Sequence, residues 1–327
     1  MKAGVIVLRT DEIEESVWKQ ISRGYEVCFG IHKTPDQLKK SFSKSITGYT
    51  LHAMKFDEDG NLMGHNYYQP RPYLLNGKSV ICALSGGTFV MPEHRKDIFV
   101  FNEMVRALDK EAAKLGWIAL LGVPNENSFK YAVKINKQKH IGDLSYYILP
   151  VHASKIIGKK IPILNFLSYG YSRALSITNK LISRYINPTE KVVPLHLDNS
   201  DAFLDIRYDW NQYTRVWKDK MEGVYRIYNE GGVRTAYITY FGENFKRNNR
   251  SLNFIVEEIL RNEEVDAILY IGTLNFKQTL LMKVPKKYAP QKLPLCVTLL
   301  DKKNSEIKEA CSSIANIDFG LINFDVR

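Results

Sequence analysis

Two adjacent cations, Arg95 and Lys96, stand just before a segment whose apolar residues have helical spacing. From Phe101 to Leu115 these residues recur at steps of one, three and four, which predicts one buried helix face. The first N–H groups of a helix have no partner inside the helix, and the helix dipole is positive at that end. Cations added there favour a negative ligand. The pattern therefore indicates a site for phosphate or a similar anion.

A carboxylate competes for the same helix start. Asp97 directly precedes the predicted helix 98–115, where aspartate is a good capping residue. A capping bond is worth about 1 kcal/mol, whereas a charge-assisted contact from Arg95 or Lys96 is worth about 1.5–3 kcal/mol. The two cations are thus able to offset the carboxylate. Asp97 nevertheless repels an anion and occupies a donor that the anion would use.

Strands on both sides must position this loop. The run 88–91 is strand-like and ends at Pro92, and the continuous apolar run 117–123 has the length of a buried strand. Pro124 ends that second strand, and the polar residues after it are suitable caps for a further helix. The caps are Asn125, Asn127 or Ser128. The order is therefore strand, cationic loop, helix, buried strand, helix start.

The same order of parts recurs later in the chain. Residues 233–241 read as a strand, 244–250 as a second cationic loop, 252–261 as a helix and 265–271 as a buried strand. Before the first copy, a turn at 57–61 predicts a β-hairpin, and Gly86-Gly87 indicates a bulge or a close approach of the backbone. We expect an α/β protein in which one fold occurs twice.

Composition limits the classes of partner. The chain has 327 residues and a net charge of +11, which favours anionic ligands such as a nucleotide-like cofactor, nucleic acid or an acidic membrane. Four cysteines without CxxC spacing predict free thiols, and seven histidines without HxxxH spacing give no metal site. The N-terminus does not resemble a signal peptide, and no run of about 18 apolar residues predicts a transmembrane helix. We expect a cytoplasmic protein.

Residues 151–192 form a basic segment with seven Lys or Arg residues against one Glu, a net +6. Within it, 162–185 has the pattern of an amphipathic helix, with one apolar side formed by Leu164, Leu167, Tyr171, Leu175 and Ile182. Contact with nucleic acid or an anionic membrane through 155–191 is one interpretation. We prefer a linker helix whose apolar side packs on the domains while its cations reach into water.

Two stretches carry a resemblance to a known family. GTFVMPEHR, residues 87–95, and LLGVPNENSFKYAVK, residues 120–134, resemble the cofactor-binding units of the GNAT acyltransferases. The resemblance spans about 3–150, and the second half looks like a shorter GNAT-like domain. It implies an α/β (α+β) fold of two tandem domains, each with a mixed central sheet flanked by helices. The expected division is a GNAT-like domain at 1–150, a basic helical linker at 151–192 and a second domain at 193–327.

This resemblance implies a cofactor site for acetyl-CoA or another acyl-CoA. The backbone of Phe89, Val90 and Met91 would pair with the pantetheine arm, and Asn125 or Asn127 would lie near the thioester. The diphosphate would meet the loop formed by Arg95, Lys96, Asp97, Ile98 and Phe99. The family's loop has the form Arg/Gln-x-x-Gly-x-Gly/Ala, and this chain has neither glycine.

The implied activity is acyl-CoA-dependent N-acyl transfer, with an acetyl group passing to a primary amine by direct attack. The chemistry needs a base for the amine and a proton donor for the leaving thiolate. His65 and Glu126 are candidate bases, and Tyr131 is the candidate acid. The acceptor is a small-molecule amine, with amino sugars among the options. The alternatives are an aminoacyl-tRNA-dependent peptidyltransferase and a GNAT-like binding protein without catalysis.

Overall fold

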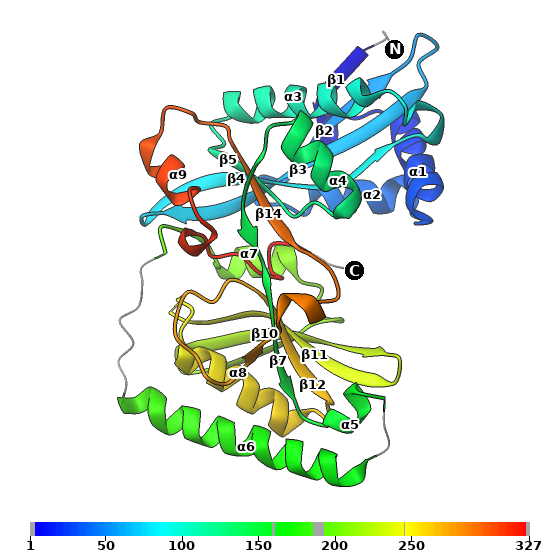
Figure 1. The fold of residues 1–327 in the computed structure, drawn as a ribbon. Helices are drawn as coiled ribbons and strands as arrows, with labels where there is room; N and C mark the ends of the chain where they lie inside the picture. Colours follow the sequence, from blue (N-terminus) through cyan, green and yellow to red (C-terminus); the bar gives the residue numbers. More distant parts are fainter. Residues whose placement is uncertain (1–3, 159–160, 186–192, 245, 325–327) are drawn as a thin grey trace. The chain divides into compact units, whose positions relative to one another are not determined.

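The computed structural model describes residues 4–158, 161–185, 193–244 and 246–324, without the side chains of 182–185. The chain forms two compact units (Figure 1). Unit 1 comprises Met1–Gly142, Pro194–Arg207 and Pro294–Asn316, and unit 2 comprises Asp143–Val193, Tyr208–Leu293 and Ile317–Arg327.

Strand pairing explains why the units interleave along the sequence. Strand β14 (Pro294–Leu299) pairs antiparallel with β5 (Ala119–Gly122) in unit 1, although it follows most of the second half in the chain. Strand β7 (Ser145–Pro150) pairs antiparallel with β12 (Ala267–Gly272) in unit 2. The division predicted from the sequence, with boundaries at residues 150 and 193, makes each domain one continuous stretch of chain. In the structure, each compact unit is instead assembled from three stretches.

In unit 1, eight strands of the described chain form one mixed sheet. Its order is β1-β2-β3-β4-β5-β14-β6, and β8 pairs with β3. Strands β1, β2, β3 and β4 pair antiparallel in succession, whereas β4 and β5 are parallel. The remaining strands are β1 (Gly4–Arg9), β2 (Leu51–Phe56), β3 (Leu62–Leu75), β4 (Lys78–Val90), β6 (Lys139–Asp143) and β8 (Leu195–Leu197).

Helices cover both faces of this sheet. Along β2, Leu51 and Ala53 belong to the core under α3 (Ile98–Lys114), whereas Met54 and Phe56 belong to the core under α1 (Glu15–Phe29) and α2 (Pro35–Ser43). The alternation follows from the two-residue period of a strand. Unit 1 also contains α4 (Glu126–Lys130), α7 (Asp201–Arg207) and α9 (Ser305–Ala310).

Unit 2 repeats the central connection of unit 1. Its sheet has the order β13-β7-β12-β11-β10-β9. Strand β11 (Val233–Glu243) leads through a loop into α8 (Asn249–Asn262), and then into β12, which is parallel to β11. The same succession of β4, α3 and β5 occurs in unit 1, which confirms the expected duplication of a mixed α/β fold. The other strands are β9 (Thr214–Lys218), β10 (Met221–Glu230) and β13 (Met282–Lys283).

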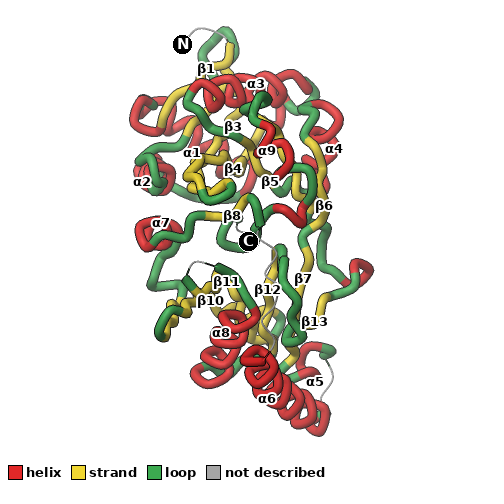
Figure 2. The backbone as a smooth tube through the Cα atoms, turned by 90° about the vertical axis from the view of Figure 1, so that its left-hand side faces the viewer, coloured by secondary structure: helices red, strands yellow, loops and turns green. Residues whose placement is uncertain are grey.

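The helix of the basic segment, α6 (Pro162–Tyr185), packs differently from the prediction. It lies beside α8 within unit 2 (Figures 1 and 2), following the short α5 (Ala153–Ile156). Of the predicted apolar side, Leu164 and Leu175 are partly buried, and Leu175 packs on the unit 2 core. Leu167 and Tyr171 are exposed, and Ile182 lies outside the described side chains. The predicted apolar side therefore faces the protein only in part, and hydrogen bonds from small polar residues also hold this helix. None of the helices in the described part of the chain combines the length and apolar character needed to cross a bilayer.

Candidate functional site

Strands β4 and β5 of unit 1 pair over only a short stretch. Cys82 to Leu84 pair with Ala119 to Leu121, but β4 continues to Val90. Within the described residues, no strand pairs with β4 from Ser85 onward on the β5 side. Backbone N–H and C=O groups on a strand edge need partners. This parting of β4 and β5 is therefore a place where an extended ligand with amide groups can add to the sheet.

A bulge reshapes β4 at this point. Tyr67 pairs with Gly86 and His65 pairs with Phe89, so β4 holds one more residue than β3 between these pairs. Gly87 has φ +53, and a Cβ there would stand 2.6 Å from the Tyr25 hydroxyl oxygen. Both the left-handed backbone and the lack of space require glycine. The predicted bulge with close backbone approach is confirmed.

Most backbone N–H groups of the cationic loop already donate hydrogen bonds within the loop. Asp97 caps α3, because its carboxylate accepts from the Phe99 N–H at 2.9 Å, as its position predicted. The N–H groups of residues 95, 97 and 100 donate to carbonyls within the loop, and Arg95 Nε donates to the Val90 carbonyl at 3.2 Å. The side chains of residues 95–99 are exposed. An incoming diphosphate would therefore meet mainly the Arg95 and Lys96 side chains, because few backbone donors are left.

The strand after α3 leads into the short helix α4. Asn125 caps this helix, since its Oδ1 accepts from the Ser128 N–H at 3.0 Å. Glu126 and Asn127 in the first turn are exposed. Tyr131 begins a π-helical turn, Tyr131–Ile135, and is 42% exposed. Asn125, Glu126, Asn127 and Tyr131 thus lie on one short element at the end of β5.

His65 lies elsewhere, fully buried on the α1/α2 face of the sheet. Its Nε2 is 2.9 Å from Nδ1 of His52, and Nε2 of His52 is 3.1 Å from the Thr10 hydroxyl. Burial lowers the pKa of His65 to about 3, and burial together with the neighbouring His65 lowers the pKa of His52 well below its usual value. Both rings are therefore neutral at physiological pH. Nδ1 of His65 is buried without a hydrogen-bond partner among the described atoms.

This histidine pair predicts loss of stability in acid. Unfolded histidines take up a proton near pH 6.5, whereas the folded chain keeps these two neutral, so acid favours unfolding. As pH falls from about 6.5 toward about 4, the free energy of unfolding should drop by up to about 1.4 kcal/mol per pH unit for each histidine. Urea unfolding followed by Trp fluorescence measures it, since the Trp18 ring is 5.4 Å from His52.

A matched pair of variants assigns this acid sensitivity to the buried rings. His65→Gln should make the pH dependence shallower, whatever it does to stability at neutral pH. His32→Gln is the control, because His32 is 77% exposed at the side chain. An unchanged pH dependence in His65→Gln would show that the buried pair is not its source.

No contact among the described residues joins the three predicted catalytic side chains. His65 belongs to the α1/α2 face, whereas Glu126 lies on α4 and Tyr131 on the π-helical turn that follows it. His52 and Thr10 were not predicted as part of any site. The hairpin register places His52 opposite Tyr67, two residues from His65 on the same face. Counting outward from the predicted turn at 57–61 would have set the two rings on opposite faces, because the register shifts by one residue between Lys55 and Phe56.

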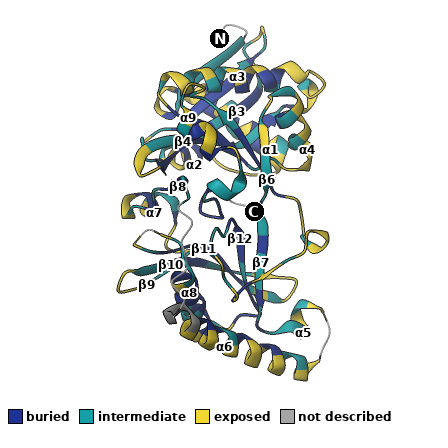
Figure 3. Cartoon of the chain, turned by 60° about the vertical axis from the view of Figure 1, so that its left-hand side comes forward, coloured by how far each residue is buried: buried dark blue, intermediate teal, exposed yellow. Residues whose placement is uncertain are grey.

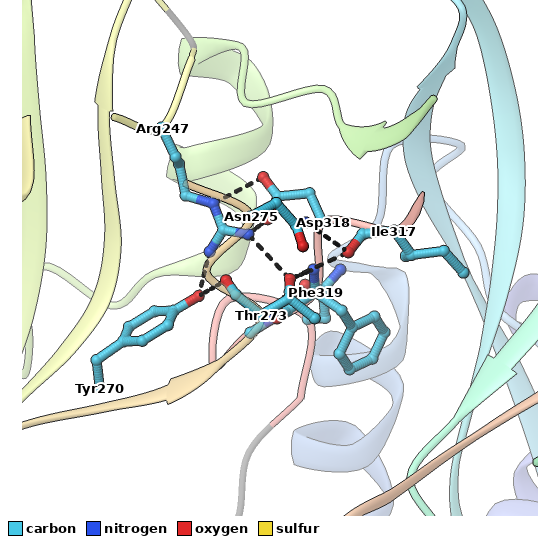
Figure 4. Close-up of polar contacts among 9 residues, drawn as sticks. Arg247, Tyr270, Thr273, Asn275, Ile317, Asp318 and Phe319 are labelled. Atoms are coloured by element: carbon cyan, nitrogen blue, oxygen red, sulfur yellow. Dashed lines mark hydrogen bonds and ion pairs between the residues drawn. The ribbon is translucent and has the colours of Figure 1, made fainter. Parts of the chain in front are cut away.

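In unit 2, residues 317–320 of the chain itself occupy the place that corresponds to the parting of β4 and β5. One edge of β12 pairs with β7, and Gly272 at the end of β12 also bridges to Gly320. The Thr273 N–H donates to the Phe319 carbonyl at 2.7 Å. Arg247, from the second cationic loop, bonds to Asp318, Tyr270 and Thr273 (Figure 4). Arg247 of the second cationic loop thus binds the Asp318 carboxylate of the same chain. Unit 1 is therefore the better candidate for a ligand site.

Comparisons with known proteins identify the fold. No protein-family model and no curated protein matches the chain. Among solved structures, a GCN5-related N-acetyltransferase from Anabaena variabilis ATCC 29413 is 10% identical, with a TM-score of 0.57 over 90% of this chain and 73% of that one. A GCN5-related N-acetyltransferase from Kribbella flavida is 11% identical, with a TM-score of 0.58 over 91% and 71%. Eis1 from Mycobacterium abscessus is 12% identical, with a TM-score of 0.51 over 94% and 76%.

These likenesses confirm the predicted fold. The chain has the fold of GCN5-related N-acetyltransferases, with two mixed sheets flanked by helices in tandem. At 10–12% identity, the likeness concerns the fold alone.

Proposed function

We propose that the chain is an acyl-CoA-dependent N-acyltransferase whose transfer site is the parting of β4 and β5 in unit 1. The observation that carries this proposal is the strand edge from Ser85 to Val90, which has no neighbouring strand on the β5 side in the described chain. A pantetheine arm has two amides that are able to complete such an edge. The starts of α3 and α4 follow directly from the two strands that part here.

The proposed placement assigns one contact to each part of the co-substrate. The backbone at Phe89, Val90 and Met91 pairs with the arm, and Asn125 and Asn127 lie toward the thioester. Arg95 and Lys96 contact the diphosphate through their side chains, because the loop's backbone donors are mostly engaged. A side-chain contact of this kind needs no glycine in the loop. Asp97 weakens it, since a carboxylate stands at the same helix start.

The proposed chemistry is direct attack of an amine on the thioester carbonyl. A C–N bond forms, the C–S bond breaks, the amine gives up a proton, and the departing thiolate receives one. Glu126 is the stronger candidate base, because it is exposed on α4, whereas the buried His65 has a pKa of about 3 and accepts protons poorly. The Tyr131 hydroxyl, on the π-helical turn that follows α4, is the candidate proton donor. A small-molecule primary amine is the acceptor, and amino sugars are the first class to test.

Acetyl-CoA binding and turnover test the proposal. We expect saturating acetyl-CoA to raise the melting temperature, because a ligand that binds only the folded state stabilises it. We also expect free thiol to appear when a panel of amino sugars and other primary amines is added, with an acetylated product in the mass spectrum. A chain that acetyl-CoA does not stabilise, and that releases no thiol with any amine, would contradict the proposal.

One observation favours a second candidate, a GNAT-like binding protein without acyl transfer. The loop before α3 bonds to itself, and Asp97 caps the helix where a diphosphate would sit. A fold that no longer binds CoA needs no open donors there. Under this candidate, acetyl-CoA has no effect on stability, and the Arg95 and Lys96 charges are dispensable.

A further inference from the structure

Helix α6 carries several large apolar side chains on its exposed side. Phe166 is 77% exposed, Ile163 68% and Ile177 60%, which is unusual for large apolar side chains on a packed helix. Figure 3 shows exposed residues along this helix. The exposed apolar residues recur at steps of one, three and four. The small residues Gly170 and Ala174 occupy the corresponding positions between Leu167 and Ile177, so all of these residues form one stripe along the helix. We call this the outer stripe: Ile163, Phe166, Leu167, Ile177 and Leu181.

The inward side of the same helix is polar. Ser172 Oγ donates to the Pro150 carbonyl at 2.7 Å, and Ser168 Oγ donates to the Val151 carbonyl at 2.8 Å. Asn179 Nδ2 donates to Asn253 Oδ1 at 3.2 Å. These side chains are buried and fix the rotation of α6 against unit 2. Because hydrogen bonds set this rotation, the outer stripe faces outward as part of the fold and is not a loosely attached surface.

Positive charge accompanies the outer stripe. No acidic residue occurs from Pro162 to Tyr185, and the surrounding residues 152–191 carry a net +6. Arg173 and Lys180 are two helical turns apart, so they flank the stripe along one side. The Arg173 guanidinium is partly buried and donates to the Leu260 carbonyl at 2.5 Å and to the Tyr169 hydroxyl at 3.1 Å. The Lys180 ammonium is paired with Glu257 at 3.0 Å and its side chain is still 48% exposed. Two copies meeting through this helix would bring like charges together. The charge therefore favours a negative partner.

We propose that α6 binds the surface of an anionic phospholipid bilayer, with the outer stripe among the acyl chains and the cations at the headgroups. An apolar stripe bordered by Lys and Arg is the pattern of a helix that lies in the plane of a membrane. A helix from Pro162 to Tyr185 would extend along the bilayer for about 36 Å. A nucleic acid suits the positive charge but gives the outer stripe no apolar partner. This proposal does not depend on acyl transfer.

Vesicle binding by the full chain tests the proposal. We expect co-sedimentation with vesicles of phosphatidylcholine mixed with phosphatidylglycerol, and much weaker binding to phosphatidylcholine alone. Phe166→Ser with Ile177→Ser should weaken binding by about tenfold for each residue, since each change removes a large apolar side chain that the proposal buries in the bilayer. Trp217→Ser is the control, because Trp217 is 73% exposed in the same unit but lies on β9. The exposed positions make misfolding of the double variant unexpected, and circular dichroism checks this.

A second measurement reports insertion directly. Phe166→Trp should be quenched by brominated acyl chains in the anionic vesicles, whereas purely electrostatic adsorption would leave the ring in water. Absence of binding to anionic vesicles at low salt would overturn the proposal, and so would equal binding by the double variant. A dimer that the double variant abolishes, without vesicle binding, would assign the outer stripe to a second copy. Salt-sensitive RNA binding without vesicle binding would assign the cations to nucleic acid.

Discussion

Arg95→Glu combined with Lys96→Glu is expected to abolish the stabilisation by acetyl-CoA. Each cation supplies a charge-assisted contact worth about 1.5–3 kcal/mol, and each glutamate adds repulsion of the diphosphate. Together these effects should weaken binding by more than about 100-fold. Isothermal titration with acetyl-CoA measures this loss. Both side chains are exposed, so the fold should tolerate the change.

Two further variants make this result specific. Lys19→Glu with Arg23→Glu changes the net charge equally on the exposed side of α1 and should leave binding unchanged. Asp97→Asn should act in the opposite direction, because asparagine still caps α3 through the Phe99 N–H but carries no charge. Binding should tighten by about five- to tenfold. If the double Glu variant binds acetyl-CoA like the unaltered chain, the diphosphate is not at this loop.

Arg247→Ala is expected to cost the chain about 2–4 kcal/mol of folding free energy, the largest effect on stability that we predict for a single substitution. Arg247 and Asp318 form a salt bridge with side chains only 11% and 16% exposed. The guanidinium also bonds to the Tyr270 hydroxyl and to the Thr273 hydroxyl (Figure 4). Its removal leaves the mostly buried Asp318 carboxylate without its cation, which is more costly than losing an exposed pair. Urea unfolding followed by circular dichroism measures the change.

A neighbouring arginine gives the matched control. Arg250 pairs with Glu243 at 3.0 Å, but its side chain is 62% exposed. Arg250→Ala should therefore change the free energy of unfolding by only about 0–1 kcal/mol. Similar losses in the two variants would mean that the pair in Figure 4 contributes no more than an ordinary surface pair. They would also mean that residues 317–320 are held by their other contacts, such as the bonds of the Thr273 and Asn275 side chains to the Ile317 carbonyl.

Local patterns predicted much of unit 1 around the loop. The apolar spacing from Phe101 to Leu115 predicted α3, and Asp97 caps that helix as expected. Gly86-Gly87 predicted the bulge, and Asn125 was among the predicted caps of α4. Each of these features depends on interactions between residues a few positions apart. Such interactions leave a direct trace in the sequence.

The pairing of distant residues was not predicted. His52 and His65 meet only because the β2–β3 register sets them on one face, and β14 joins β5 across more than half of the chain. The orientation of α6 was predicted only in part, for a related reason. Apolar periodicity finds the two sides of a helix, but it assumes that the apolar side faces the protein. Here the serines have carbonyl partners on the adjacent strand β7 and its end, and these bonds decide the side.

By itself, the sequence determined the elements around Arg95 and Lys96, their duplication, and a charge that suits an anionic ligand. The tertiary structure decided which copy remains open. In unit 1 the edge of β4 beyond Leu84 has no described strand beside it on the β5 side, whereas in unit 2 Arg247 and residues 317–320 occupy the corresponding place. That difference depends on where a distant segment of the chain packs. Segments far apart in sequence meet only through the packing of the whole unit, which no local pattern encodes.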